Sequence, residues 1–125
     1  MELNQLSGAI IDSAMKVHTN LGAGMLESTY EICLTHELKK RGLNIQAQLA
    51  LPVFYDGIKL DAGYRIDLLV ENAVIVELKA VERILPIHEA QLLSYLKLSN
   101  KKVGLLLNFN VVHFKNGTKR IVNNF

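Results

Sequence analysis

The sequence has few of the residues that mark special classes of protein. Its single cysteine, Cys33, excludes an internal disulfide, and no neighbouring pattern indicates an activated thiol, so we expect a core residue. It has two prolines, no tryptophan and no low-complexity segment. Apolar runs such as Val103–Leu107 fall far short of the roughly 20 residues that span a bilayer. The first residues lack the basic and apolar blocks of a signal peptide, so we expect one soluble, cytoplasmic domain over residues 1–125.

Net charge is small but unevenly distributed. The formal charge is +2 at pH 7. Residues 1–62 hold five Lys or Arg and seven Asp or Glu, whereas residues 63–125 hold nine and five. The halves therefore carry −2 and +4, which permits a polyanionic partner and is equally compatible with an ordinary solvated surface.

Hydrophobic periodicity predicts three helices and a mixed sheet. Apolar residues recur at helical spacing first, the period changes to two after Gly42, and Asp56-Gly57 and Asn116-Gly117 have the composition of tight turns. The expected order is ααβββαββ, an α/β arrangement in which helices flank a mixed sheet. We expect helices over Leu3–Leu21, Met25–Arg41 and Pro86–Leu98, and strands over Ile45–Tyr55, Ile58–Leu60, Tyr64–Val70, Ala73–Val81 and Val103–Phe109, followed by a terminal hairpin.

Three charged residues interrupt strands that otherwise read as buried. In "VIVELKA", residues 74–80, strand alternation places Glu77 and Lys79 on one face, and Asp67 lies on the preceding strand. Buried charges are costly unless they are paired or bind a metal. A plain ion pair between Glu77 and Lys79 is the simpler of the two explanations, and a metal site is the other.

The geometry of these charges depends on the loop between the two strands. A two-residue turn at Glu71-Asn72 would place Asp67 opposite Val76, and Glu77 would face away. A three-residue loop, Glu71–Ala73, or a bulge places Asp67 opposite Glu77, and we predict this geometry. Converging carboxylates are hard ligands that suit Mg²⁺ or Mn²⁺, and a nearby ammonium can orient water or offset charge on a phosphate. Such a site is what metal-assisted phosphodiester cleavage requires, although the ExK pattern taken alone favours the plain ion pair.

Three motifs in order carry a resemblance to a known family. "GMLESTY", residues 24–30, fits GxxExxY, Asp67 with Glu77-Leu78-Lys79 fits D…ExK, and Gln91 with Tyr95 fits QxxxY. Over about residues 17–121 the chain resembles the GxxExxY family, small proteins assigned to the PD-(D/E)XK nuclease superfamily. The resemblance implies a restriction-endonuclease-like α/β fold and a Mg²⁺- or Mn²⁺-dependent nuclease, with DNA as the expected nucleic acid.

The resemblance also implies roles at the metal site. Asp67, Glu77 and the backbone carbonyl of Leu78 would bind the metal, and Lys79 would be the catalytic lysine. Glu27 would be the acidic residue that the first core helix directs toward the metal. The alternative for Glu27 is an ordinary first-turn glutamate that the helix dipole favours.

Further expected contacts lie on the third helix and on basic residues. Gln91 and Tyr95, which the resemblance makes catalytic, would share a helix face directed at the ExK strand, and the alternative is ordinary helix surface. Tyr30 is expected to pack or to form a hydrogen bond near Glu27. The expected nucleic-acid-binding residues are His88, Lys101, Lys102, Lys119 and Arg120.

A second class of function fits the same sequence. The chain would then be a non-catalytic nucleic-acid-binding or assembly module of the same fold. In either case so small a chain has little beyond the core to grip a polymer, so a homodimer or a partner protein is expected to contribute.

Overall fold

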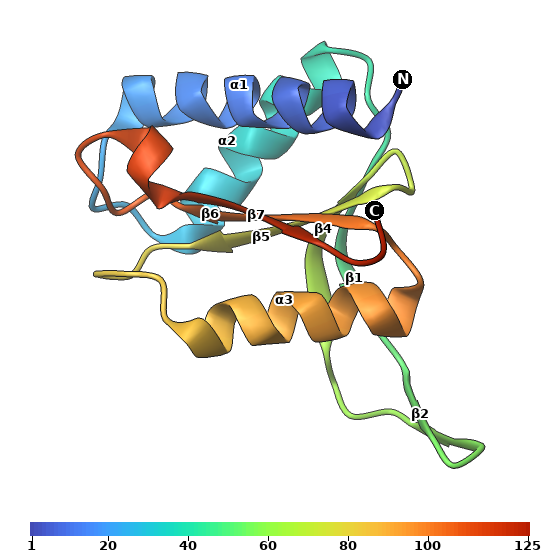
Figure 1. The fold of residues 1–125 in the computed structure, drawn as a ribbon. Coiled ribbons are helices and arrows are strands. Elements are labelled where there is room, and N and C mark those ends of the chain that lie inside the picture. The colour runs from blue at the N-terminus through green and yellow to red at the C-terminus, as the bar shows by residue number, and fades with distance from the viewer.

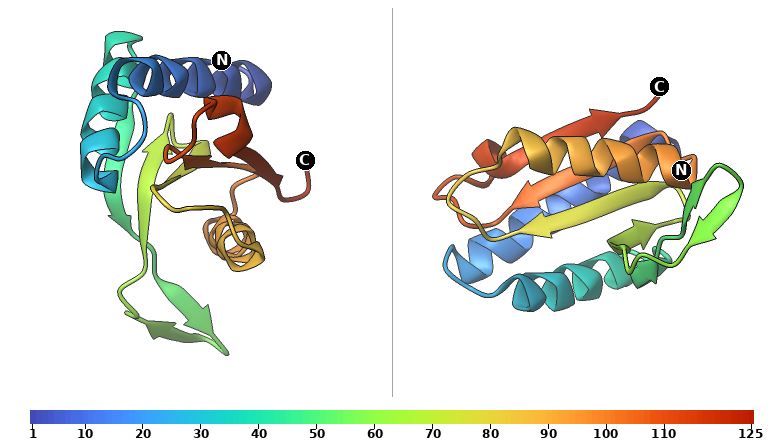
Figure 2. Two further views of the ribbon diagram at one scale, coloured as in Figure 1. Left: turned by 90° about the vertical axis from the view of Figure 1, so that its left-hand side faces the viewer. Right: turned by 90° about the horizontal axis from the view of Figure 1, so that it is seen from below.

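A five-stranded mixed sheet forms the middle layer of the protein, with helices on both faces (Figure 1). The computed structural model describes residues 1–125. Helices α1 and α2 cover one face and α3 covers the other, as the two views of Figure 2 also show. The helices are α1 (Leu3–Leu21), α2 (Glu27–Lys40) and α3 (Pro86–Ser99), and the strands of the sheet, in spatial order, are β1 (Ile45–Ala50), β4 (Arg65–Val70), β5 (Val74–Lys79), β6 (Val103–Asn108) and β7 (Thr118–Val122).

The predicted α/β class and element order are confirmed for the helices and this sheet. Taken along the chain, these elements read ααβββαββ. β1, β4 and β5 pair antiparallel, β5 and β6 pair parallel, and β6 and β7 pair antiparallel. Parallel neighbours require a crossover, which α3 supplies on the face opposite α1 and α2. No helix is both long enough and apolar enough to cross a membrane.

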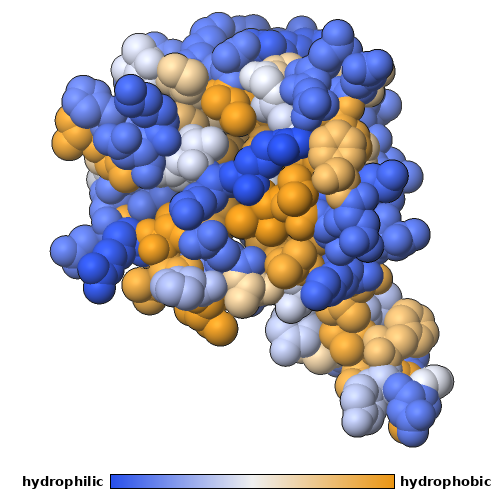
Figure 3. Space-filling model, in the orientation of Figure 1, coloured by the Kyte–Doolittle hydropathy of each residue, from blue (hydrophilic) through white to orange (hydrophobic).

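The strand predicted over Ile45–Tyr55 is broken at Pro52, which lies outside any strand. Proline has no N–H to donate to a ladder, so it interrupts strand pairing. The chain continues as a separate two-stranded hairpin, β2 (Val53–Tyr55) and β3 (Ile58–Leu60). This hairpin projects from the body of the molecule (Figures 1 and 3).

The turn of the projecting hairpin matches its prediction. Asp56 and Gly57 have φ values of 51° and 76°, as a two-residue hairpin turn with both residues left-handed requires. The hairpin has no core of its own, because its large apolar side chains are exposed on both strands. These side chains are Phe54, Tyr55, Ile58 and Leu60.

The predicted hairpin turn at Asn116-Gly117 is wrong. β6 and β7 do pair antiparallel, but their connection contains a 3₁₀ helix, η1 (Phe114–Gly117), and neither Asn116 nor Gly117 has a positive φ. Gly117 is needed for a different reason, because a Cβ there would collide with the backbone carbonyl oxygen of Asn108. A glycine that allows close approach looks the same in a sequence as one that allows a turn.

Apolar residues form two cores, one on each face of the sheet. In β5, Val76 and Leu78 point into the core shared with α1 and α2, whereas Ile75 points into the core shared with α3. The strand is therefore buried on both faces, as its near-continuous apolar run predicts. Cys33 packs, partly buried, against the first core, which agrees with its expected structural role.

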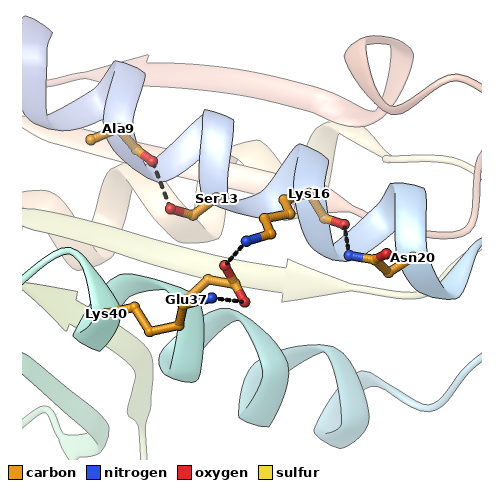
Figure 4. Close-up of polar contacts among 6 residues, drawn as sticks. All are labelled: Ala9, Ser13, Lys16, Asn20, Glu37 and Lys40. Carbon is orange, nitrogen blue, oxygen red and sulfur yellow. Dashed lines mark hydrogen bonds and ion pairs between the residues drawn. The ribbon is translucent and has the colours of Figure 1, made fainter.

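An exposed ion-pair network joins the two helices that cover the first core (Figure 4). Lys16 Nζ of α1 lies 3.1 Å from Glu37 Oε1 of α2, and Lys40 Nζ lies 3.5 Å from Glu37 Oε2. The hydrogen bond from Lys16 lowers the pKa of Glu37 and raises the pKa of Lys16 itself. Because these pairs lie at the protein surface, they add little to the packing of α1 against α2.

Candidate metal and catalytic site

The loop between β4 and β5 sets the register of the site. Val70 pairs with Val74 and Leu68 with Val76, so the loop is Glu71–Ala73 and the predicted three-residue geometry is confirmed. The first two loop residues have φ values of 53° and 51°, and the Ala73 N–H closes the turn by donating to the Val70 carbonyl at 3.0 Å. This register brings Asp67 level with Glu77.

The Asp67 and Glu77 carboxylates each accept a hydrogen bond from the backbone of the other residue's strand. The Asp67 N–H donates to Glu77 Oε2 at 3.0 Å, and the Leu78 N–H donates to Asp67 Oδ2 at 2.9 Å. These bonds replace the backbone ladder, which stops at the Leu68–Val76 pair. The two carboxylates therefore lie where β4 and β5 part. The other two oxygens, Asp67 Oδ1 and Glu77 Oε1, accept no backbone N–H.

Burial makes the Glu77 carboxyl a much weaker acid than usual. Its side chain is 6% exposed. Burial, then the negative charge of Asp67 and a hydrogen bond with the Asp67 carboxyl, raise the pKa of Glu77 to about 9. The backbone hydrogen bond from Asp67 and the charge of Lys79 offset this only in part. Glu77 accordingly holds a proton near neutral pH. A divalent cation at this position would take the place of that proton.

Lys79 is half-buried at the end of β5, on the same face as Glu77. No carboxylate oxygen lies within 4.0 Å of its ammonium, so the simple ion pair between Glu77 and Lys79 is absent. The backbone at this point is fixed by the next strand. The Phe109 N–H donates to the Lys79 carbonyl at 2.9 Å, and Asn108 Oδ1 accepts from the Val81 N–H at 3.1 Å.

The residues of GxxExxY build the start of α2. Gly24 has a φ of 95°, which L side chains rarely adopt, in the loop that precedes the helix. The Tyr30 hydroxyl closes this loop by donating to the Gly22 carbonyl at 2.6 Å and accepting from the Met25 N–H at 3.1 Å. The Tyr30 ring stacks on Phe109, with centroids 4.4 Å apart. Tyr30 thus has the structural role expected of it.

A cavity of about 140 Å³ connects the start of α2 with the ExK strand. Its wall includes three residues expected at the metal site, Glu27, Asp67 and Leu78. It also includes Glu31 and Gln48, which sequence reasoning missed. Glu31 had a signal, because it lies four residues after Glu27 and hence on the same helix face. Gln48 had none, because nothing in a strand pattern marks it.

Tyr95 faces the carboxylates from α3. It is buried in the second core, and its pKa is raised by burial and then by the negative charges of Glu77, Tyr64 and Asp67. Gln91, one turn earlier on α3, is exposed, and its side chain makes no hydrogen bond. The predicted face of α3 is therefore directed at the ExK strand through Tyr95, with Gln91 at its edge.

The residues expected to bind nucleic acid do not form one group. His88 Nδ1 accepts from the Leu85 N–H at 3.0 Å and so caps α3. Lys119 forms an ion pair with Glu89 of α3 at 3.6 Å. It lies level with Glu77, because both residues pair with Leu106 of β6. Arg120 contacts Asn4 of α1 at 2.8 Å, on the opposite face of the sheet.

The remaining two lysines lie away from the site. Lys101 contacts Asn72 at 3.3 Å, and Lys102 is exposed beside it. β5 and β6 run parallel, so both lysines lie at the start of these strands and Lys79 lies at the end. Six residues of strand separate the two ends, which is about 20 Å at 3.3 Å per residue.

The donor set fits a hard cation that keeps part of its water shell. No three His, Cys, Asp or Glu side chains are gathered to hold a metal ion. Two carboxylates and a backbone carbonyl are, however, the few protein oxygens with which Mg²⁺ is commonly held, while waters and substrate oxygens complete its octahedron. Glu27 lines the cavity from the first turn of α2 and is exposed to solvent.

The fold and this pair of carboxylates define a class of protein. A family model described as the PD-(D/E)XK nuclease superfamily matches residues 4–121. The chain belongs to this superfamily. Searches of curated proteins and of solved structures gave no match.

Proposed function

We propose that the protein is a nuclease that uses Mg²⁺ or Mn²⁺ to hydrolyse phosphodiester bonds in nucleic acid, with DNA as its substrate. The observation that carries the proposal is the mutual bonding of Asp67 and Glu77 where β4 and β5 part. A module that only binds a polyanion has no use for two carboxylates there, whereas a metal-dependent hydrolase requires them. Membership of the superfamily supports the same reaction class.

Asp67, Glu77 and the Leu78 carbonyl are the proposed metal ligands. When bound, the cation would stabilise charge on the phosphate and lower the pKa of a water. Asp67 Oδ1 and Glu77 Oε1 are the oxygens that would bind it, because Oδ2 and Oε2 accept backbone N–H bonds. Those backbone bonds would keep both carboxylates in place before the cation arrives.

Lys79 is the proposed catalytic residue beside the ligands. The attacking water forms a new P–O bond and gives up a proton to solvent, while the bond from phosphorus to the leaving oxygen breaks and that oxygen takes a proton from solvent. Lys79 would orient that water or offset the negative charge that develops on the phosphate. Gln91 and Tyr95 would position the lysine, the water or the substrate, and Glu27 would assist from the start of α2.

The position of the basic residues favours substrate contact on the α3 face. His88 and Lys119 lie at the same end of the sheet as Glu77 and are the proposed first contacts with the phosphate backbone. Lys101, Lys102 and Arg120 would contact only a polymer that extends beyond this end. We also propose that the chain belongs to the GxxExxY group within the superfamily, and that a homodimer or a partner protein adds grip on the substrate.

Cleavage of labelled polymers tests this function. Linear and circular DNA, single- and double-stranded, and RNA are incubated with the protein in Mg²⁺, in Mn²⁺ or in chelator. We expect metal-dependent cutting of DNA that Lys79→Ala and Asp67→Asn each abolish. The matched controls, Lys39→Ala and Asp12→Asn, remove the same charges from exposed helix positions and should cut normally.

The outcome separates the two classes of function. Cutting that survives both site substitutions would place the chemistry elsewhere or in a contaminant. No cutting of any polymer, combined with no change in melting temperature on adding metal, would favour the non-catalytic binding or assembly module. The circular substrates distinguish internal from end-directed attack.

A further inference from the structure

Gln48 has a backbone conformation that is unusual for a residue in a strand. Its φ is 52°, in the left-handed region, although it is not glycine and lies within β1. Its neighbours Ala47 and Leu49 pair normally with Leu68 and Ile66 of β4. The strain is therefore confined to the one residue opposite Asp67.

Three polar contacts hold Gln48 in this conformation. Its side-chain Nε2 donates to Glu31 Oε1 at 2.6 Å and lies 3.4 Å from Asp67 Oδ1. Its backbone carbonyl accepts from Arg65 Nη1 at 3.1 Å. One amide group thus bridges a carboxylate of α2 and a carboxylate of β4, across the cavity that both of them line.

The amide reduces the repulsion between two carboxylates in that cavity. Without it, Glu31 and Asp67 would be two like charges facing each other with no donor between them. The bridge also acts on the second oxygen of Asp67. Oδ2 already accepts from the Leu78 N–H, so a donor near Oδ1 fixes the rotation of the carboxylate while leaving Oδ1 directed at the cavity.

We propose that Gln48 is a positioning residue, whose strained backbone is retained because its amide sets Asp67 and Glu31 for cation binding. The inference rests on the proposed function, because it assumes that Asp67 binds a metal. It extends that function by adding Glu31 and Gln48 to the site. Strain at a residue that contacts functional groups is a recognised form of pre-organisation.

Replacing Gln48 by glycine separates the two consequences of the proposal. Gln48→Gly relieves the backbone strain and removes the amide. We expect the melting temperature in chelator not to fall, and to rise by up to about 5 °C. We expect Mn²⁺ affinity, measured by calorimetry, to weaken by about 10- to 100-fold. Gln48→Asn, which tolerates a left-handed φ and keeps a shorter amide, should recover part of that affinity.

Gln46 provides a matched control on the same strand. It is an exposed glutamine in β1 with an ordinary φ, paired with Leu69. Gln46→Gly should lower the melting temperature by about 2–5 °C, as glycine does in a strand, and leave Mn²⁺ affinity unchanged. The two substitutions are thus expected to change the melting temperature in different directions, and only Gln48→Gly should change the affinity for Mn²⁺.

Three results would overturn the inference, and they are distinguishable. If the wild type binds Mn²⁺ and Gln48→Gly binds it equally well, Gln48 does not position the site and only this inference fails. If the wild type binds neither Mn²⁺ nor Mg²⁺, both the proposed function and this inference are wrong. A fall in melting temperature for Gln48→Gly equal to that of Gln46→Gly would show that the conformation is not strained.

Discussion

Asp67 and Glu77 exchange hydrogen bonds that the backbones of their two strands would otherwise make. The Asp67 N–H donates to Glu77 Oε2, and the Leu78 N–H next to Glu77 donates to Asp67 Oδ2. Each carboxylate therefore has one oxygen that accepts a backbone N–H and one oxygen that does not. The arrangement lets β4 and β5 part without leaving unpaired N–H groups, and it makes the site part of the fold.

Metal binding and catalysis should separate between two variants. Asp67→Ala removes a proposed ligand, so adding Mn²⁺ at about 100 times its dissociation constant should no longer give the stabilisation of about 3 kcal/mol expected for the wild type. Lys79→Ala removes no ligand and should keep that stabilisation while losing cleavage. Thermal unfolding with and without Mn²⁺ measures both. A loss of stabilisation in Lys79→Ala would make Lys79 part of the metal-binding apparatus instead.

The stability of the metal-free protein should fall as pH rises. The pKa of Glu77 is about 9 in the folded protein, against an ordinary value of 4.5. Between these values the folded state binds a proton that the unfolded state has released, so the free energy of unfolding decreases with pH. Urea unfolding in chelator should show a loss on the order of a few kcal/mol between pH 5.5 and pH 8.5.

Glu77→Gln tests the origin of this pH dependence. The amide cannot ionise, so this variant should be more stable than the wild type at pH 8.5 and should lose most of the slope. Glu82→Gln, a matched change at an exposed loop position, should keep the wild-type slope. An unchanged slope in Glu77→Gln would assign the pH dependence to other groups.

Tyr30→Phe should loosen the loop before α2. The change deletes a hydroxyl that bonds to both Gly22 and Met25 and leaves the ring stacked on Phe109. We expect a loss of about 1–3 kcal/mol in the free energy of unfolding and faster hydrogen exchange at the Met25 amide. Tyr55→Phe, at an exposed position in the hairpin, should change neither. If the Met25 amide of Tyr30→Phe exchanged at the wild-type rate, the loop would keep its conformation without the tyrosine hydroxyl.

Two glycine substitutions should have effects of opposite sign. Gly117→Ala places a Cβ against the Asn108 carbonyl and should destabilise the protein by at least about 1–3 kcal/mol. Gly8→Ala, in α1 with open space around it, should stabilise by about 0.5–1 kcal/mol. Chemical unfolding of the two variants measures both changes in the free energy of unfolding. Equal effects would mean that the connection between β6 and β7 shifts easily to admit a side chain.

The sequence predicted most of the fold because its periods agree with the elements that form. The first two helices were predicted to end beside Gly22 and Gly42, and both glycines have a positive φ in the structure. The strand pattern also predicted the three-residue loop after β4, because only that register sets Asp67 and Glu77 together. These features depend on local pattern and on the cost of burying charge.

The features that sequence reasoning missed depend on contacts between distant segments. Gly117 is required by Asn108, which lies on another element, so Asn116-Gly117 was wrongly assigned to a turn. Gln48 adopts its conformation through Glu31 and Arg65, and an ordinary glutamine in a strand gives no sign of this. Tertiary contacts override local propensity at both places.

The projecting hairpin, β2 with β3, is inserted between two strands that are already neighbours. Ala50, the last residue of β1, pairs with Arg65, the first residue of β4, and the Leu51 N–H donates to the Tyr64 carbonyl at 2.8 Å just beyond them. The whole segment is therefore an elongated loop on an antiparallel pair, and the entropy of closing a loop grows only slowly with its length. The segment can therefore change in length or sequence while the carboxylates keep their places, which makes it a suitable point for inserting or exchanging sequence.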